Sequence, residues 1–127
     1  PVRPSDDPNN MSLVLRITYG DTSFLFTGDA ERDEEADILK AGYPLKSTVL
    51  KAGHHGSETS TSYPFLRAVA PQYGVISCGA GNSYGHPHKE TLKKYAEHRI
   101  QVLRTDEKGT IIASSSPEGL TWTYTKK

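Results

Sequence analysis

The chain has 127 residues, of which 35% are hydrophobic and 24% charged, a length and composition typical of a single globular domain with its own core. Fifteen basic residues balance fifteen acidic ones, which argues against a protein that holds nucleic acid tightly and non-specifically through its phosphates. No apolar run approaches the roughly 18 residues of a membrane span, and the single cysteine, Cys78, excludes an internal disulfide and a cysteine-rich zinc site.

The first half of the chain predicts a β-hairpin followed by a helix. Residues 1–9 are polar and proline-rich and lack the features of a signal peptide, so we expect a leading loop or the cut end of a longer protein. Alternating apolar residues predict the two strands, and Ala36, Ile38 and Leu39 give the helix its apolar side. The predicted elements are a strand over 12–18, a turn at 19–21, a strand over 23–27 and a helix over 31–40 that stops at Gly42.

The second half alternates strands with helices and ends in another hairpin. Ser62 is among the candidate N-caps of the first helix here, and we expect Cys78 to be a small buried side chain after a strand. The predicted elements are strands over 45–52, 73–77 and 100–104, helices over 62–69 and 88–98, and a hairpin of 109–114 with 120–124. This order predicts an α/β layered domain with hairpins at both ends.

Three of the predicted strands are followed by loops rich in metal-ligating residue types. These loops read TGDAE at 27–31, GHHGS at 53–57 and NSYGHPH at 82–88, and they hold four of the five histidines. The fifth, His98, ends a predicted helix, and we expect it at the surface. Loops at the ends of strands in an α/β sheet converge on one crevice, where ligands usually bind.

The residue types in these loops suit a metal site. Zinc takes imidazole nitrogens and carboxylate oxygens, and a carboxylate such as Asp29 has two oxygens that can bridge two ions. His54 and His55 follow a predicted strand, so we expect them to point to different sides because strand side chains alternate. One of the pair would then bind metal while the other faces substrate.

Each loop alone also has an ordinary explanation. Gly28-Asp29 is a common turn, Glu31 is an acid in the first turn of a helix, and residues 85–87 read as a turn before a helix. An adjacent His-His pair can lie on any surface. The joint placement of one Asp, one Glu and four His at three strand ends favours a metal-hydrolase crevice.

Four segments, in this order and spacing, resemble the metallo-β-lactamase domain of ComEC-type DNA internalisation proteins. They are SLVLRITYGDTSFLFTGDAERDEE, STVLKAGHHGSETST, VISCGAGNSYGHPHKETL and LRTDEKGTI, and the resemblance runs from about Asn10 to about Ile112. The resemblance implies half of an αββα sandwich, a mixed sheet with helices on one face. Residues 1–127 would be the C-terminal part of one such domain.

The resemblance also implies roles for individual residues. Asp29 and His54 would be ligands of a two-zinc site that manganese could also occupy, although whether His54 or His55 is the ligand stays open. The remaining residues would be catalytic or would bind substrate, and they are His55, Glu31 and His86 in the first group and Ser57 and Asn82 in the second.

Two motifs of the family are absent from this sequence. They are the His-x-His-x-Asp-His run, which supplies most metal ligands, and the histidine of the third motif. We expect both to lie upstream in a longer protein. One carboxylate and one or two histidines cannot hold two zinc ions firmly, so we expect this chain alone to be inactive and to bind metal weakly or not at all.

The function implied by the resemblance is that of a phosphodiesterase or nuclease in DNA uptake during competence and transformation. It would act on single-stranded DNA, next to a membrane channel region and on the outer side of the cell membrane. One alternative is a secreted hydrolase of another phosphoester, such as a phosphocholine ester. Another is a non-catalytic DNA-handling module, which the presence of Asp29, His54 and His55 disfavours.

Overall fold

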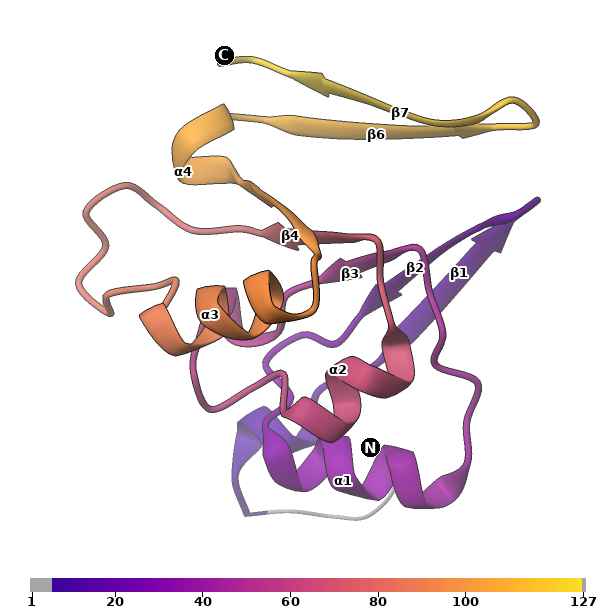
Figure 1. The fold of residues 1–127 in the computed structure, drawn as a ribbon. Helices are drawn as coiled ribbons and strands as arrows, with labels where there is room; N and C mark the ends of the chain where they lie inside the picture. The colour runs from indigo at the N-terminus through magenta and orange to yellow at the C-terminus, as the bar shows by residue number, and fades with distance from the viewer. Residues whose placement is uncertain (1–5, 127) are drawn as a thin grey trace.

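A computed structural model describes residues 6–126 and confirms the α/β class (Figure 1). The main sheet has five strands in chain order, and only its first pair is antiparallel. The remaining strands run parallel. The strands are β1 (Leu15–Tyr19), β2 (Thr22–Phe26), β3 (Val49–Lys51), β4 (Tyr73–Ile76) and β5 (Gln101–Arg104).

Helices lie on one face of this sheet and a hairpin lies on the other (Figure 1). The helices that cover the first face are α1 (Arg32–Ala41), α2 (Tyr63–Val69) and α3 (Lys89–Glu97). The hairpin consists of β6 (Ile111–Ser116) and β7 (Gly119–Tyr124), which form a separate two-stranded sheet. Three short helices complete the chain: η1 (Pro8–Met11), η2 (Gly53–Gly56) and α4 (Thr105–Lys108).

The core lies between the sheet and the helices. Paired residues of neighbouring strands share a face, which places Leu25, Leu50 and Gly74 on the helix side. A methyl group on Gly74 would lie 3.2 Å from the buried Tyr95 ring, so the absence of a side chain there lets α3 pack closely. The buried residues of the cluster are Leu25, Ile38, Leu45, Leu50, Ala52, Phe65, Leu66, Val69, Ile76, Tyr95 and Ile100.

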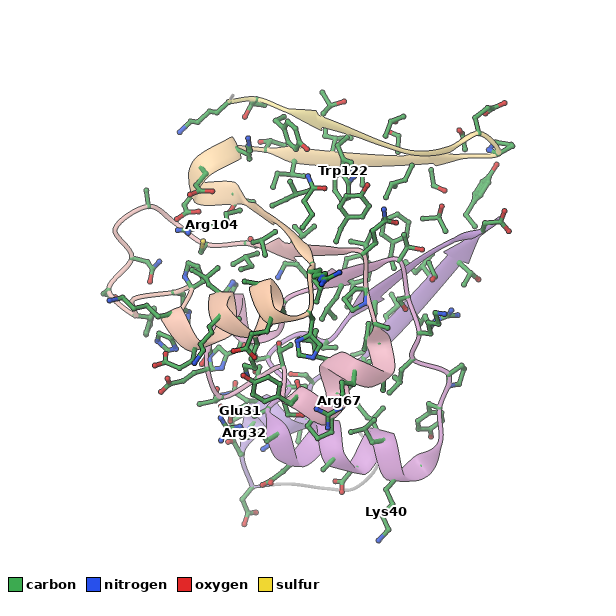
Figure 2. The ribbon with its side chains drawn as sticks, viewed as in Figure 1. Glu31, Arg32, Lys40, Arg67, Arg104 and Trp122 are labelled. Carbon is green, nitrogen blue, oxygen red and sulfur yellow. The ribbon has the colours of Figure 1, made fainter. Side chains whose placement is uncertain are left out.

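The opposite face of the sheet is only partly covered. Trp122 points from β7 toward the sheet (Figure 2), and its ring centroid lies 5.0 Å from that of Tyr73. Between hairpin and sheet lies a cavity of 260 Å³, lined in part by Phe24, Val49 and Val75. Leu15 and Ile17 of β1 pair with Phe26 and Phe24, which places them on this face of the sheet. Their side chains remain exposed there.

The buried side of α1 differs from the prediction. Ile38 is buried as expected, but Ala36 is exposed, and the acids Glu34 and Glu35 are buried in its place. Glu34 accepts a hydrogen bond from the Ser12 backbone N–H, and Glu35 accepts from two backbone N–H groups of the chain before α2. The apolar pattern missed these contacts because both are made to residues distant in sequence.

Several element boundaries also differ. The strand predicted over 45–52 is the shorter β3, and α4 was not predicted. Part of the leading loop predicted over 1–9 belongs to η1, where Asp7 caps the turn by accepting from the Asn9 N–H; residues 1–5 lie outside the described part. Cys78 is half-buried rather than buried.

Between residues 6 and 126, no helix has both the length and the apolar character needed to cross a membrane.

Candidate metal centre

The three loops singled out in the sequence meet at the carboxyl ends of β2, β3 and β4. The His54 backbone N–H donates to the Gly28 carbonyl over 2.9 Å, which joins the first loop to the second. The His88 N–H donates to the Gly56 carbonyl over 3.0 Å, which joins the second to the third. Parallel strands bring their carboxyl ends to one edge of the sheet, and the three loops therefore lie side by side there, as predicted.

The backbone of Asp29 is fixed from outside its own strand. Gly28 has φ +59°, and a methyl group on it would lie 3.1 Å from the Ser12 side chain. The Ser12 hydroxyl accepts a hydrogen bond from the Asp29 N–H over 3.0 Å and donates to the Asn9 carbonyl. A glycine is therefore needed before Asp29, and Ser12 is a positioning residue that the sequence motifs did not reveal.

The two histidines after β3 do not follow the predicted strand alternation. The strand ends at Lys51, and His54 and His55 have φ values of 49° and 54°, in the left-handed region. Such values are uncommon outside glycine and often mark functional sites. A left-handed turn, and not the pleat of a strand, therefore gives the two rings their separate surroundings.

One ring nitrogen of His54 makes no hydrogen bond. Its Nδ1 is buried and has no hydrogen-bond partner, and it lies 3.8 Å from Oε2 of Glu31. This distance suits an ion pair but is too long for a hydrogen bond. In metal sites a carboxylate commonly orients a histidine ligand by accepting a hydrogen bond from its other ring nitrogen, and Glu31 lies on that side of His54 without making this bond.

His55 makes a different contact. Its Nδ1 lies 2.8 Å from the Ser77 carbonyl oxygen. A carbonyl can only accept, so the hydrogen of the neutral ring sits on Nδ1 and the lone pair on Nε2. The residue is exposed, which leaves Nε2 open to a substrate or an ion.

His86 lies among the other aromatic rings of the site. Its ring centroid lies 5.6 Å from His54, 6.3 Å from His55, 4.8 Å from His88 and 5.6 Å from Tyr84. Burial lowers the pKa of His86, and the neighbouring His88, His54 and His55 lower it further, against the opposite effect of Asp29. These neighbours therefore favour the neutral form of the ring.

The two residues expected to bind substrate are engaged within their own loops. The Asn82 side chain accepts from the His86 N–H over 2.9 Å and donates to the His86 carbonyl over 2.6 Å, so it shapes the loop that carries His86. Ser57 is buried, and its hydroxyl lies 2.9 Å from that of Thr59. Substrate contacts by these two residues stay a prediction.

His88 and the RTDEKG segment also have parts in the site. The His88 Nδ1 accepts from the Glu58 N–H over 2.9 Å, which links the second and third loops again. The Thr105 hydroxyl accepts from the Cys78 N–H and donates to the Cys78 carbonyl, both over 2.9 Å. Burial raises the pKa of the Cys78 thiol, with a further contribution from Asp106. The two hydrogen bonds between Thr105 and Cys78 fix the start of the loop that leads to His86.

The described residues fit part of a metal centre. Asp29 and His54 bring donor atoms that zinc prefers, and Glu31 lies 3.8 Å from the buried Nδ1 of His54, on a side from which a carboxylate can orient an imidazole ligand. Within residues 6–126, no three His, Cys, Asp or Glu side chains gather closely enough to hold an ion.

Comparison with known proteins connects this geometry to a family. The model of the metallo-beta-lactamase superfamily matches residues 2–80, which include Asp29, Glu31 and His54–Ser57. This chain belongs to the metallo-β-lactamase superfamily. The match ends before Asn82 and His86, so the third loop lies outside the part that the family model describes.

This metallo-β-lactamase chain is related to competence proteins. It is 44% identical over 103 residues to ComE operon protein 3 of Bacillus subtilis, with 81% of the chain covered. It is 44% identical over 115 residues to competence protein ComA of Neisseria gonorrhoeae, with 87% covered. It is 36% identical over 104 residues to recombination protein 2 of Haemophilus influenzae, with 81% covered. The matched part spans only 13%, 17% and 13% of these relatives.

Proposed function

We propose that this chain is the C-terminal part of a metallo-β-lactamase domain that hydrolyses phosphodiesters of DNA during uptake. The observation that carries the proposal is the buried Nδ1 of His54, which has no hydrogen-bond partner and lies 3.8 Å from the Glu31 carboxylate, on a loop hydrogen-bonded to the Gly28-Asp29 turn. A histidine and a carboxylate held together at strand ends suit a hydrolytic metal better than a purely structural role.

In this proposal Asp29 and His54 hold zinc, or manganese in its place, together with ligands from the preceding part of the same domain. Bound zinc lowers the pKa of water toward neutrality and stabilises charge on a phosphoryl oxygen. Glu31 orients the His54 ring through its carboxylate, 3.8 Å from Nδ1. We choose His54 over His55 as the ligand because its backbone is tied directly to the Asp29 turn.

His55 is the proposed acid–base group. Its Nδ1–H is occupied by the Ser77 carbonyl, so Nε2 can take a proton and then give it to the leaving oxygen. His86 lies beside His55, with ring centroids 6.3 Å apart, and is proposed to donate a hydrogen bond to substrate. In this proposal Ser57 and Asn82 contact the phosphate of the substrate.

The proposed substrate is single-stranded DNA, in line with the resemblance to DNA internalisation proteins and with a relative named a competence protein. Zero net charge favours a brief substrate contact over tight binding. The proposed partners are the preceding half of the domain and a membrane channel region of the same protein, on the outer side of the membrane. The rival proposal, a secreted phosphoester hydrolase, predicts a signal peptide and no channel region in the full gene.

The test is hydrolysis of single-stranded DNA by the longer protein that contains this chain, with zinc or manganese added. Asp29→Ala is expected to lower the rate at least about 100-fold, because it removes a metal ligand. The matched control is Asp33→Ala, an exposed acid at the start of α1, which should keep the wild-type rate. Equal activity of wild type and Asp29→Ala would leave the non-catalytic DNA-handling module as the better account.

A further inference from the structure

A buried hydroxyl group connects the loop of Asp29 to the loop of His54. Ser60 Oγ donates a 2.6 Å hydrogen bond to the carbonyl of Ala30, the residue between Asp29 and Glu31. Ser60 and Ala30 are both 0% exposed. Water therefore cannot take over this hydrogen bond without a rearrangement of the two loops.

Ser60 is itself held from the helix side. The Lys94 ammonium group, on α3, donates to the Thr61 carbonyl over 2.7 Å and to the Ser60 carbonyl over 3.4 Å. The Glu35 carboxylate, on α1, accepts from the Thr61 N–H over 2.6 Å and from the Ser62 N–H over 2.8 Å. The buried side chains of Glu35 and Lys94 thus hold the backbone of residues 60–62 in place.

The two loops are also packed closely against each other. A methyl group on Gly53 would lie 3.0 Å from the Thr27 hydroxyl, 3.1 Å from Ser60 Cβ and 3.4 Å from the Ala30 carbonyl oxygen. Two backbone hydrogen bonds complete the junction, from His54 to Gly28 over 2.9 Å and from Arg32 to Thr59 over 3.2 Å. The hydrogen bond from the Ser60 hydroxyl to the Ala30 carbonyl comes from a side chain, so a substitution can remove it without deleting a backbone group.

We propose that Ser60 is a positioning residue of the metal site: its hydroxyl, on a backbone segment held by Lys94 and Glu35, fixes the loop of Asp29 against the loop of His54. This inference rests on the proposed function, because it takes these two residues to be ligands. A ligand pair must be held to within about 0.5 Å to bind its ion well. Ser60 itself touches neither substrate nor ion.

The test compares Ser60→Ala with Ser62→Ala in the longer protein. Ser62 is two residues away; its hydroxyl caps α2 at the Phe65 N–H and also hydrogen-bonds the Glu35 carboxylate, but it does not contact Ala30. Two quantities are measured: zinc affinity by competition with a chelating dye, and amide hydrogen exchange at His54 without metal. Ser60→Ala should weaken zinc binding and speed His54 exchange, each by about tenfold, since a buried acceptor is left unpaired.

The matched control separates positioning from stability. Ser62→Ala should lower the unfolding midpoint but leave zinc affinity and His54 exchange as in the wild type. If the two variants affected zinc affinity and exchange equally, the positioning role of Ser60 would be wrong while the metal site stood. A wild-type protein that binds no zinc would overturn the proposed function and this role together. Should Ser60→Ala not fold, Ser60→Cys keeps the volume with a weaker donor and should show a smaller effect of the same kind.

Discussion

Gly56 is the residue at which the two histidine loops meet. Its φ is +86°, and a methyl group added to it would lie 2.7 Å from the Pro87 side chain. Its carbonyl also accepts the hydrogen bond from the His88 N–H. A side chain at this position would therefore force the loop of His54 away from the loop of His86.

Replacing Gly56 by alanine should lower the free energy of unfolding by about 2 kcal/mol, because strain at positive φ adds to a steric contact. The matched control is Gly81→Ala, which has φ +66° but open space around the added methyl group. We expect a loss of about 1 kcal/mol there. Urea denaturation of both variants measures the difference, and equal losses would show that the loop contact at Pro87 carries no cost.

At the scale of the element, α1 is unusual because its buried side contains two acids. Glu34 is 2% exposed, and its Oε2 has no hydrogen-bond partner, whereas both oxygens of Glu35 accept backbone hydrogen bonds. Burial raises the pKa of each carboxyl group above its ordinary value. Glu35 holds the chain before α2, while half of the Glu34 carboxylate is unsatisfied.

Glu34→Gln should therefore stabilise the protein at pH 7 by on the order of 1 kcal/mol, since it removes a buried charge with an unsatisfied oxygen. A carboxyl group with a raised pKa in the folded state favours folding below its ordinary pKa of 4.5, and that stability is lost as pH rises through the folded pKa. The advantage of glutamine should thus vanish near pH 4. Thermal unfolding across this range is the measurement, with the exposed Asp33→Asn as control; a constant difference at all pH values would contradict it.

Sequence patterns predicted the helices and strands better than they predicted the contacts between them. Alternation and caps predicted β1, β2 and α2 to within a few residues, and Gly42 ends α1 in the left-handed conformation as expected. The burial of Glu34 and Glu35 depends on Ser12, Thr61 and Ser62. No local pattern reports such long-range partners.

The candidate site was predictable to a similar degree. The strand-end rule predicted that the three loops converge, and motif resemblance singled out Asp29 and His54. The left-handed turn at His54 and His55 was missed, because positive φ in residues other than glycine has no reliable sequence signal. Ser12 and Ser60 were missed for another reason: a serine hydroxyl bonded to a distant backbone looks like any other serine.

At the scale of the whole molecule, the sheet has one face packed on helices and one face partly bare. The hairpin covers part of this second face, where the Trp122 ring contacts the Tyr73 ring. On β1, the side chains of Leu15, Ile17 and Tyr19 are still 48%, 47% and 53% exposed. A row of exposed apolar side chains on an edge strand is typical of a surface that another element covers. This supports the proposal that the preceding half of the domain packs there, close to the loops that it would complete with ligands.

The most direct test of this account is a calorimetric zinc titration of the 127-residue chain beside the longer protein that contains it. The longer protein should bind zinc with a Kd below about 1 μM, and Asp29→Ala should weaken that binding strongly. The chain alone should bind weakly or not at all, since in the proposed function Asp29 and His54 are only part of a ligand set. Binding below about 1 μM by the chain alone, or unchanged zinc affinity in Asp29→Ala, would contradict the account.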